Sequence, residues 1–400
     1  MSLRISTRGV TEAGIETLQK RQVEMAEAQE RLTTGKRVHK ASDDPAAAAR
    51  AERALAGQMR AETSQRAVDA SRTAMSLSET AMGDAIELLQ QAREAMVAAG
   101  NASYSDQERA NLAEKVKAIR NQLLSVANRT DGAGTFLFGG QGATTRPFVD
   151  APGGIDYRGI SGERRTELAT DLPLTVNGDN VFMTARTGNG VFQTSAGAGV
   201  TTAWIDNGQV SNPAALTGST YTLQFSVSGG ATTYAVLQDG NPTAVTAAPY
   251  VSGQDITVDG MTFRISGAPA NGNSFTVQPS SSTLSVFDAL DRAATQLATS
   301  GRSSAQIAQG NTDALRDIDQ SMAQLQGARA VAGEMLVRID GETSRLDDQK
   351  LANQIQRSSA EDLDMTEAIS KFQSMQTGYD AALKSYSMVQ RLSLFEYLRT

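Results

Sequence analysis

The chain has 400 residues, a formal net charge of −7 and no cysteine. This length suffices for two or three domains at roughly 150 residues each. The absence of cysteine excludes disulfides, thiolate metal sites and cysteine nucleophiles. The negative charge disfavours nucleic acids and anionic membrane surfaces as partners. The first ten residues lack the apolar stretch of a secretory signal, and no run of about 18 apolar residues is present. On these features alone, a cytosolic address is expected.

The first zone, residues 1–129, is rich in Ala, Glu, Gln and Arg and predicts helices. Its first helix has a coiled-coil seam with 3,4 spacing, formed by Ile15, Leu18, Gln22, Met25, Gln29 and Leu32. We expect Gly35 to end this helix in the left-handed conformation. Asp44 and Pro45 have the residue types that cap and begin the next helix.

Two more helices are predicted before residue 130. The second helix carries an apolar residue every seven positions and stops at Gly100, with a seam of Val68, Met75, Met82, Leu89 and Met96. Ser105 and Glu108 form a capping box that opens the third helix. Its inner face consists of Leu112, Val116, Ile119, Leu123 and Val126. We expect an antiparallel pair of helices joined by a short loop.

The middle zone, to about Ser282, is rich in Gly, Thr, Ser and Val and predicts strands. Apolar and polar residues alternate from Tyr221 to Val227, which is typical of a strand with one buried face. Asp259-Gly260 predicts a two-residue type I′ turn. The hairpin then places five apolar side chains on one face: Ile256, Val258, Met261, Phe263 and Ile265.

The third zone returns to helix. A 3,4 seam runs from Leu315 to Leu346, and Ser358 to Glu361 fits a second capping box. We therefore expect a mainly α fold with an inserted β domain, in which both terminal zones form an antiparallel coiled-coil rod and the β region is a side knob. The predicted parts are a terminal packing region (1–41 and 360–400), a helical rod core (42–146 and 283–359) and an outer β-rich domain (147–282).

No catalytic, cofactor-binding or metal-binding residues are predicted, so the chain is not expected to be an enzyme. His39 is the only histidine, which excludes a two-histidine zinc site, and its loop position favours a solvated residue over a catalytic one. Neighbouring acids such as Asp43-Asp44 do not face each other on a helix and are better explained as caps or solvated groups. The glycines of residues 132–140 fit no nucleotide-binding fingerprint and indicate a tight turn.

The terminal apolar seams instead predict a packing surface between molecules, because they bury too little to stabilise a lone pair of helices. The candidate assembly residues are Ile5, Ile15, Leu18, Met25, Leu32, Ile369, Phe372, Tyr379, Leu383, Tyr386, Leu392, Leu394, Phe395 and Leu398.

Three motifs resemble the flagellin family of axial flagellar proteins. They are residues 32–46 (LTTGKRVHKASDDPA), residues 128–140 (NRTDGAGTFLFGG), and residues 361–398 with their LSLFEYL ending. The second resembles a segment of the member that joins the hook to the filament, and the third is closer to that member than to flagellin. Residues 261–277 are similar to a β module of the hook-associated proteins.

This resemblance implies a structural subunit of the bacterial flagellum, outside the cell, exported through the flagellar type III channel without a cleaved signal peptide. It replaces the cytosolic expectation. The partners that it implies are hook-associated protein 1 on the hook side, flagellin on the filament side, further copies of the chain in a ring, and a cytoplasmic export chaperone. Flagellin itself is the alternative interpretation, and a secreted adhesin with a binding β domain is a weaker one.

Overall fold

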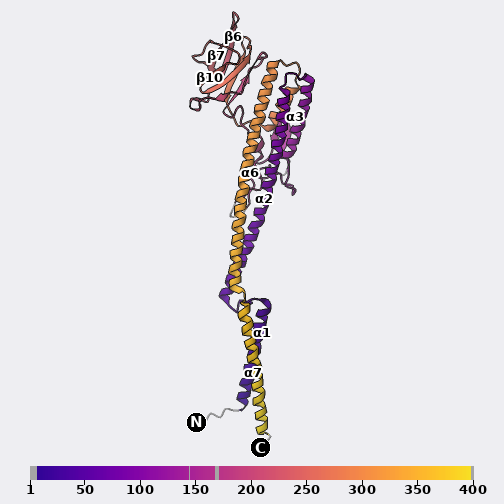
Figure 1. Cartoon of the computed structure of the whole chain (residues 1–400), viewed down its shortest axis with the longest axis vertical. Helices are drawn as coiled ribbons and strands as arrows, with labels where there is room; N and C mark the ends of the chain where they lie inside the picture. Colours follow the sequence, from indigo (N-terminus) through magenta and orange to yellow (C-terminus); the bar gives the residue numbers. More distant parts are fainter. Residues whose placement is uncertain (1–6, 144, 167–170, 398–400) are drawn as a thin grey trace. The chain divides into compact units, whose positions relative to one another are not determined.

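The computed structural model describes residues 7–143, 145–166 and 171–397. The chain forms two compact units. The terminal unit comprises residues 1–66 and 342–400, and the central unit comprises residues 67–341. Figure 1 shows the elements along the chain.

Long helices come from both ends of the sequence, as predicted. Their bounds are α1 Thr7–Thr34, α2 Pro45–Ala99, α3 Asp106–Ala127, α4 Gly178–Phe182, α5 Val286–Ala298, α6 Ser304–Glu361 and α7 Met365–Tyr397, with a 3-10 turn at Pro213–Ala215. Both α2 and α6 contribute residues to each unit. The described chain is mainly α with an inserted antiparallel β region, which confirms the predicted fold class.

The strands form antiparallel sheets in the middle of the sequence. Their bounds are β1 Phe148–Ala151, β2 Gly154–Tyr157, β3 Phe192–Ala196, β4 Ala203–Ile205, β5 Gln209–Val210, β6 Tyr221–Ser228, β7 Ala231–Gln238, β8 Asn241–Pro242, β9 Ala248–Pro249, β10 Asp255–Val258, β11 Met261–Gly267 and β12 Ser274–Pro279. β1 and β2 form a hairpin. The larger sheet has the order β3-β12-β6-β7-β8, and a second has the order β10-β11-β4.

The helical core of the central unit joins α2, α3, α5 and α6. The predicted seam of α2 from Val68 to Met96 is buried, as are Ile318, Leu325 and Ala332 of α6. Ion pairs Arg72–Asp340 (2.6 Å) and Arg93–Asp319 (2.8 Å) show that α2 and α6 run antiparallel here. Burial of this apolar cluster, at about 25 cal/mol per Å², contributes strongly to the stability of the unit.

Several described residues between 148 and 182 also belong to this helical core. Phe148, Ile155, Val181 and Phe182 are buried with the helices, and the Phe148 and Phe182 rings meet edge to face at 5.4 Å. The apolar core of the β region begins at Phe192. Residues of the predicted 147–282 domain therefore divide between two cores, and the domain boundaries stay a prediction.

The predicted hairpin is confirmed. Val258 pairs with Met261, and Asp259 and Gly260 have φ values of 41° and 79°, as a type I′ turn requires. Its apolar side chains face the β core. In β6, Tyr221, Leu223 and Phe225 are buried as predicted, but Val227 is exposed near the strand's end.

Helix ends follow the predicted caps in three cases and differ in one. Gly35 has a φ of 69°, and Asp44 accepts hydrogen bonds from the Ala46 and Ala47 amides. The Ser105–Glu108 capping box is present. The second predicted box is wrong, because α6 continues through Ser358 to Glu361. Instead, Asp364 caps α7 by accepting from the Thr366 and Glu367 amides at 2.9 and 3.1 Å.

Candidate assembly surface

The two terminal helices form an antiparallel pair in the terminal unit. Gly14 of α1 lies beside the Tyr386 ring of α7, and Arg21 lies beside Gly378. At the other end of the pair, Lys36 and Asp362 form an antiparallel bridge. The absence of a side chain at Gly14 and Gly378 lets α1 and α7 approach closely at these points.

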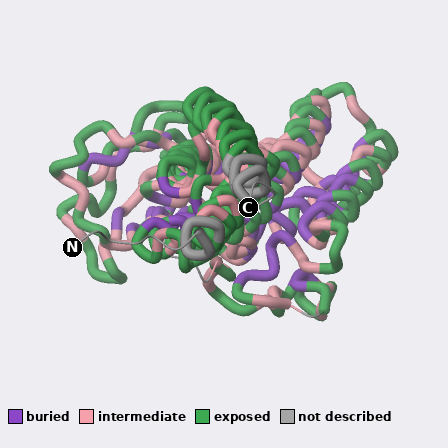
Figure 2. The backbone as a smooth tube through the Cα atoms, turned by 90° about the horizontal axis from the view of Figure 1, so that it is seen from below, coloured by how far each residue is buried: buried purple, intermediate pink, exposed green. Residues whose placement is uncertain are grey.

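None of the described side chains of this pair is buried, although the helices pack together. This holds for residues 12–34 of α1 and 365–388 of α7. The described turns of both helices are green and pink in Figure 2. Helices that bury so little gain little from tertiary packing, which supplies most of the stability of helices in proteins.

Each predicted seam divides into two rows. One row is partly covered by the partner helix and contains Leu18, Met25, Leu32, Phe372, Tyr379 and Tyr386. The other row is exposed and uncharged, and we call it the flank row: Ile15, Gln22, Gln29, Ile369, Gln376 and Leu383. Ile15, Ile369 and Leu383 expose 41%, 45% and 41% of their surface. Its members recur every seven residues on each helix.

The structure does not describe the side chains of the other five predicted assembly residues. Ile5 and Leu398 lie outside the described residues, and so do the side chains of Leu392, Leu394 and Phe395.

An elbow of main-chain hydrogen bonds connects the two helices at their other end. The Glu361 carbonyl accepts from the Arg37 amide at 2.7 Å, and the Leu363 amide donates to Gly35 at 2.9 Å. The Arg37 guanidinium donates to the Ala360 carbonyl at 2.8 Å. These bonds bring two segments of the family-like motifs, near residues 35 and 361, into one strand-like contact, which sequence spacing alone did not reveal.

The loop that follows the elbow is held by two carboxylates. The Asp43 side chain accepts from the Lys40 and His39 amides, and these hydrogen bonds lower the pKa of its carboxyl. The Ala47 amide lowers the pKa of Asp44 in the same way, and Arg37 adds to the effect. Both carboxylates are therefore structural caps. His39 is exposed, with its Nε2 3.5 Å from Glu30, as expected for a solvated loop residue.

A hollow of about 510 Å³ lies between the elbow, α1 and α7. Nine of its fourteen lining residues are charged, among them Glu24, Arg31, Glu367 and Lys371, and the other five are apolar. Small-molecule sites are mostly apolar with a few polar groups, so this lining favours a solvated groove.

Within the described residues, no group of three or more His, Asp or Glu side chains is arranged to bind a metal ion. No described helix combines the length and apolarity needed to cross a bilayer.

Comparison with known proteins gives consistent matches. Residues 5–143 match the model of the bacterial flagellin N-terminal helical region, and residues 315–398 match that of the C-terminal helical region. The flagellar hook-associated protein 3 of Salmonella typhimurium is 31% identical over 180 residues, which are 45% of this chain and 57% of that protein. The chain thus matches little more than half the length of this curated relative.

Two solved structures are similar over nearly their whole length. A crystal structure of Xanthomonas campestris FlgL is 30% identical, with a TM-score of 0.68, and the match covers 77% of this chain and 99% of that one. Hook-associated protein 3 of Legionella pneumophila is 27% identical, with a TM-score of 0.71 and coverage of 76% and 97%.

Terminal helices of flagellin type around an inserted β region define an axial protein of the bacterial flagellum. More narrowly, the chain belongs to the flagellar hook-associated protein 3 (FlgL) family. The resemblance that the sequence motifs predicted is confirmed.

Proposed function

We propose that this chain is a structural, non-catalytic subunit of the flagellum that joins the hook to the flagellin filament, outside the cell. Support comes from the similarity to FlgL over 99% of the Xanthomonas campestris chain. A Legionella pneumophila relative, 29% identical with a TM-score of 0.64 over 70% of this chain and 95% of that one, is described as a flagellar junction protein. Its description favours this position over that of a filament subunit.

The observation that carries the mechanism is the flank row. It presents exposed, uncharged side chains on two helices in which no described side chain is fully buried. In this proposal neighbouring subunits cover the three apolar members of the row, Ile15, Ile369 and Leu383, because exposed apolar patches mark interaction sites. In this proposal, residues 1–41 and 360–400 pack around the flagellar axis, residues 42–146 and 283–359 form the rod core, and residues 147–282 face outward.

The proposed partners are hook-associated protein 1 on the hook side, flagellin on the filament side and further copies of this chain in a ring. Export through the flagellar channel without a cleaved signal peptide, with a cytoplasmic chaperone, completes the proposal. The candidate assembly residues named from the sequence, together with the flank row, form its packing surface.

Immunogold labelling of isolated flagella tests the position. Label confined to the distal end of the hook supports the junction role. Label along the whole filament would assign the chain to the filament instead.

The packing surface is tested by the double substitution Ile369→Ser and Leu383→Ser in the full chain. Burying each side chain at an interface is worth about 2 kcal/mol, whereas both are nearly half exposed in this chain. We expect an unchanged monomer that is secreted but fails to assemble, with flagellin lost to the medium and no swimming. The matched control is Val245→Ser with Val251→Ser, which removes two exposed apolar residues of the β region. Normal filaments on the double variant would contradict the proposed surface.

A further inference from the structure

The two apolar cores of the central unit do not merge. The helical core extends through α2, α3, α5 and α6, and the β core starts at Phe192. Among the described residues, Ala185 and Leu284, which form a bridge, make a small separate cluster with Ala289 of α5. Apolar packing therefore does little to fix how the β region sits on the helices.

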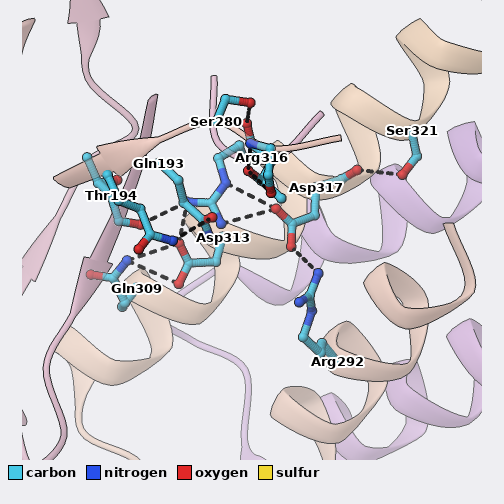
Figure 3. Close-up of polar contacts among 12 residues, drawn as sticks. Gln193, Thr194, Ser280, Arg292, Gln309, Asp313, Arg316, Asp317 and Ser321 are labelled. Carbon is cyan, nitrogen blue, oxygen red and sulfur yellow. Dashed lines mark hydrogen bonds and ion pairs between the residues drawn. The ribbon is translucent and has the colours of Figure 1, made fainter. Parts of the chain in front are cut away.

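A charged cluster occupies this boundary instead (Figure 3). The Arg316 side chain of α6 is only 5% exposed. Its Nη1 is 2.9 Å from Asp313 Oδ1 and its Nη2 is 3.1 Å from Asp317 Oδ1. Asp317 also pairs with Arg292 of α5 at 2.8 Å. Two arginines and two aspartates thus balance in charge.

This cluster binds the main chain of the β region at two strands. Arg316 Nη1 donates to the Thr194 carbonyl of β3 at 3.2 Å. Gln309 Oε1 accepts from the Ile205 amide of β4 at 2.8 Å, while its Nε2 donates to Asp313 at 3.2 Å. Residues 309, 313, 316 and 317 lie on one side of α6, because residues 313 and 316 or 317 follow residue 309 by about one and two helical turns.

The chain enters and leaves the β region through a paired connection. Ala185 and Leu284 form an antiparallel bridge, and the Thr187 amide donates to the Ser281 carbonyl at 2.9 Å. Two adjacent linkers of this kind can bend together while both cores stay intact. A small hollow of about 170 Å³ beside Thr194, Arg292 and Arg316 leaves room at the boundary.

We propose that the cluster of Arg292, Gln309, Asp313, Arg316 and Asp317 is a latch that fixes the orientation of the β region on the helical core. Opening the latch frees the β region to move as a body about the 185–187 and 281–284 connection. Buried charges are costly when one partner is removed, so the latch is strong only while it is complete. Because it binds backbone groups, it positions the strands whatever their side chains are.

The test uses the full chain with Arg316→Met. The first reading is hydrogen exchange of the Ile205 amide, which bonds to Gln309 and not to a neighbouring strand. We expect exchange to become faster by about tenfold or more, while peptides of α3 and β6 keep their protection. The matched control is Arg264→Met, which removes an exposed arginine paired with Asp255 inside the β region. It should leave the Ile205 amide unchanged.

The second reading is a distance distribution between spin labels at Ser125→Cys on α3 and Ser228→Cys on β6. The absence of native cysteine makes this labelling specific. We expect a narrow distribution in the parent and control proteins and a broad one with Arg316→Met. Gln309→Ala removes the hydrogen bond to the Ile205 amide without leaving a buried charge unpaired. It should make Ile205 exchange faster even if Arg316→Met does not fold.

Unchanged Ile205 exchange in both latch variants would overturn the proposal. So would an unchanged label distance in a folded Arg316→Met protein. If Gln309→Ala reduced protection in α3 and β6 as much as at Ile205, the residues would be general core supports and the latch would be rejected.

Discussion

Gly140 shows why one family-like motif needs its glycines. Its φ is 68°, a region that side chains with a Cβ rarely adopt. A Cβ at this position would also overlap the Ile160 carbonyl oxygen. The motif at residues 136–140 is therefore a structural turn. The Gly140 amide donates a hydrogen bond to the Val176 carbonyl at 3.2 Å and so holds the turn in place. This agrees with the tight turn that the sequence predicts.

Gly140→Ala should destabilise the central unit by about 3 kcal/mol, because conformational strain and a backbone clash add together. Gly134→Ala is the matched control. Gly134 has a φ of 95° but no neighbour within 4 Å of a Cβ, so strain alone should cost about 1 kcal/mol. Chemical denaturation measures both free energies of unfolding. If both variants lost the same unfolding free energy, the contact with Ile160 would not contribute to the cost of the Gly140 substitution.

Asp313 gives the latch a specific pH dependence. Burial raises the pKa of its carboxyl, against the lowering effect of Arg316 and Gln309, and Asp317 raises it further. A raised carboxyl pKa means that Asp313 stays protonated to a higher pH in the folded state than in the unfolded chain. The stability from this group is therefore full below the ordinary carboxyl pKa of 3.8 and decreases as pH rises through the folded pKa.

Asp313→Asn should remove this dependence. The difference in unfolding free energy between parent and variant should shift in the variant's favour as pH rises from 3.8 through the folded pKa. Denaturation series at several pH values measure that difference and cancel the titration of other groups. A difference that is flat with pH, or that shifts toward the parent, would contradict the raised pKa.

At the scale of elements, periodicity predicted the terminal helices but not their orientation. Ile15 and Leu18, or Ile369 and Phe372, are similarly apolar and belong to the same 3,4 seam. Only the pairing of α1 with α7 decides that Leu18 and Phe372 are partly covered while Ile15 and Ile369 are exposed. Likewise, Ser358 fits a capping pattern, yet α6 does not end there, since a local pattern does not report whether a helix continues.

The terminal helices should be the least stable elements of the monomer, because α1 and α7 have no buried side chain in their described parts. We expect trypsin to cleave first at Lys20, Lys371 and Lys384. Lys115 and Lys117 of α3 are the control sites, since they are also exposed but lie on a helix with a buried face. Mass spectrometry of the fragments over time gives the order in which these sites are cleaved. Cleavage in α3 before the terminal sites would contradict this ranking.

For the whole molecule, composition was enough to predict the order of helices, strands and helices. It did not reveal that Phe148, Ile155, Val181 and Phe182 join the helical core. The strands and the helix that carry them have only four or five residues each, which is too few for residue composition to show where they pack. The latch was also missed. Arg316 and Thr194 are distant in sequence, and their contact involves a backbone carbonyl that no side-chain pattern records.

Two excisions from the full chain test how the central unit is divided. Replacing residues 188–280 with a short Gly/Ser linker removes the β core and reconnects Thr187 to Ser281, whose main chains are already hydrogen bonded. The helical core should stay folded, because none of its buried residues is lost. The latch residues then face water, where an unmade ion pair costs little.

Replacing residues 147–282 instead removes Phe148, Ile155, Val181 and Phe182 from the helical core. Each lost Phe alone should cost about 3 kcal/mol or more, so this variant should lose cooperative unfolding and protection in α3 and α5. Circular dichroism and hydrogen exchange distinguish the two. If both excisions leave α3 and α5 equally protected, residues 148–182 are dispensable for the helical core and the outer domain begins near residue 147. If the shorter excision also abolishes protection there, the two cores depend on each other, and the helical core does not fold without the β region.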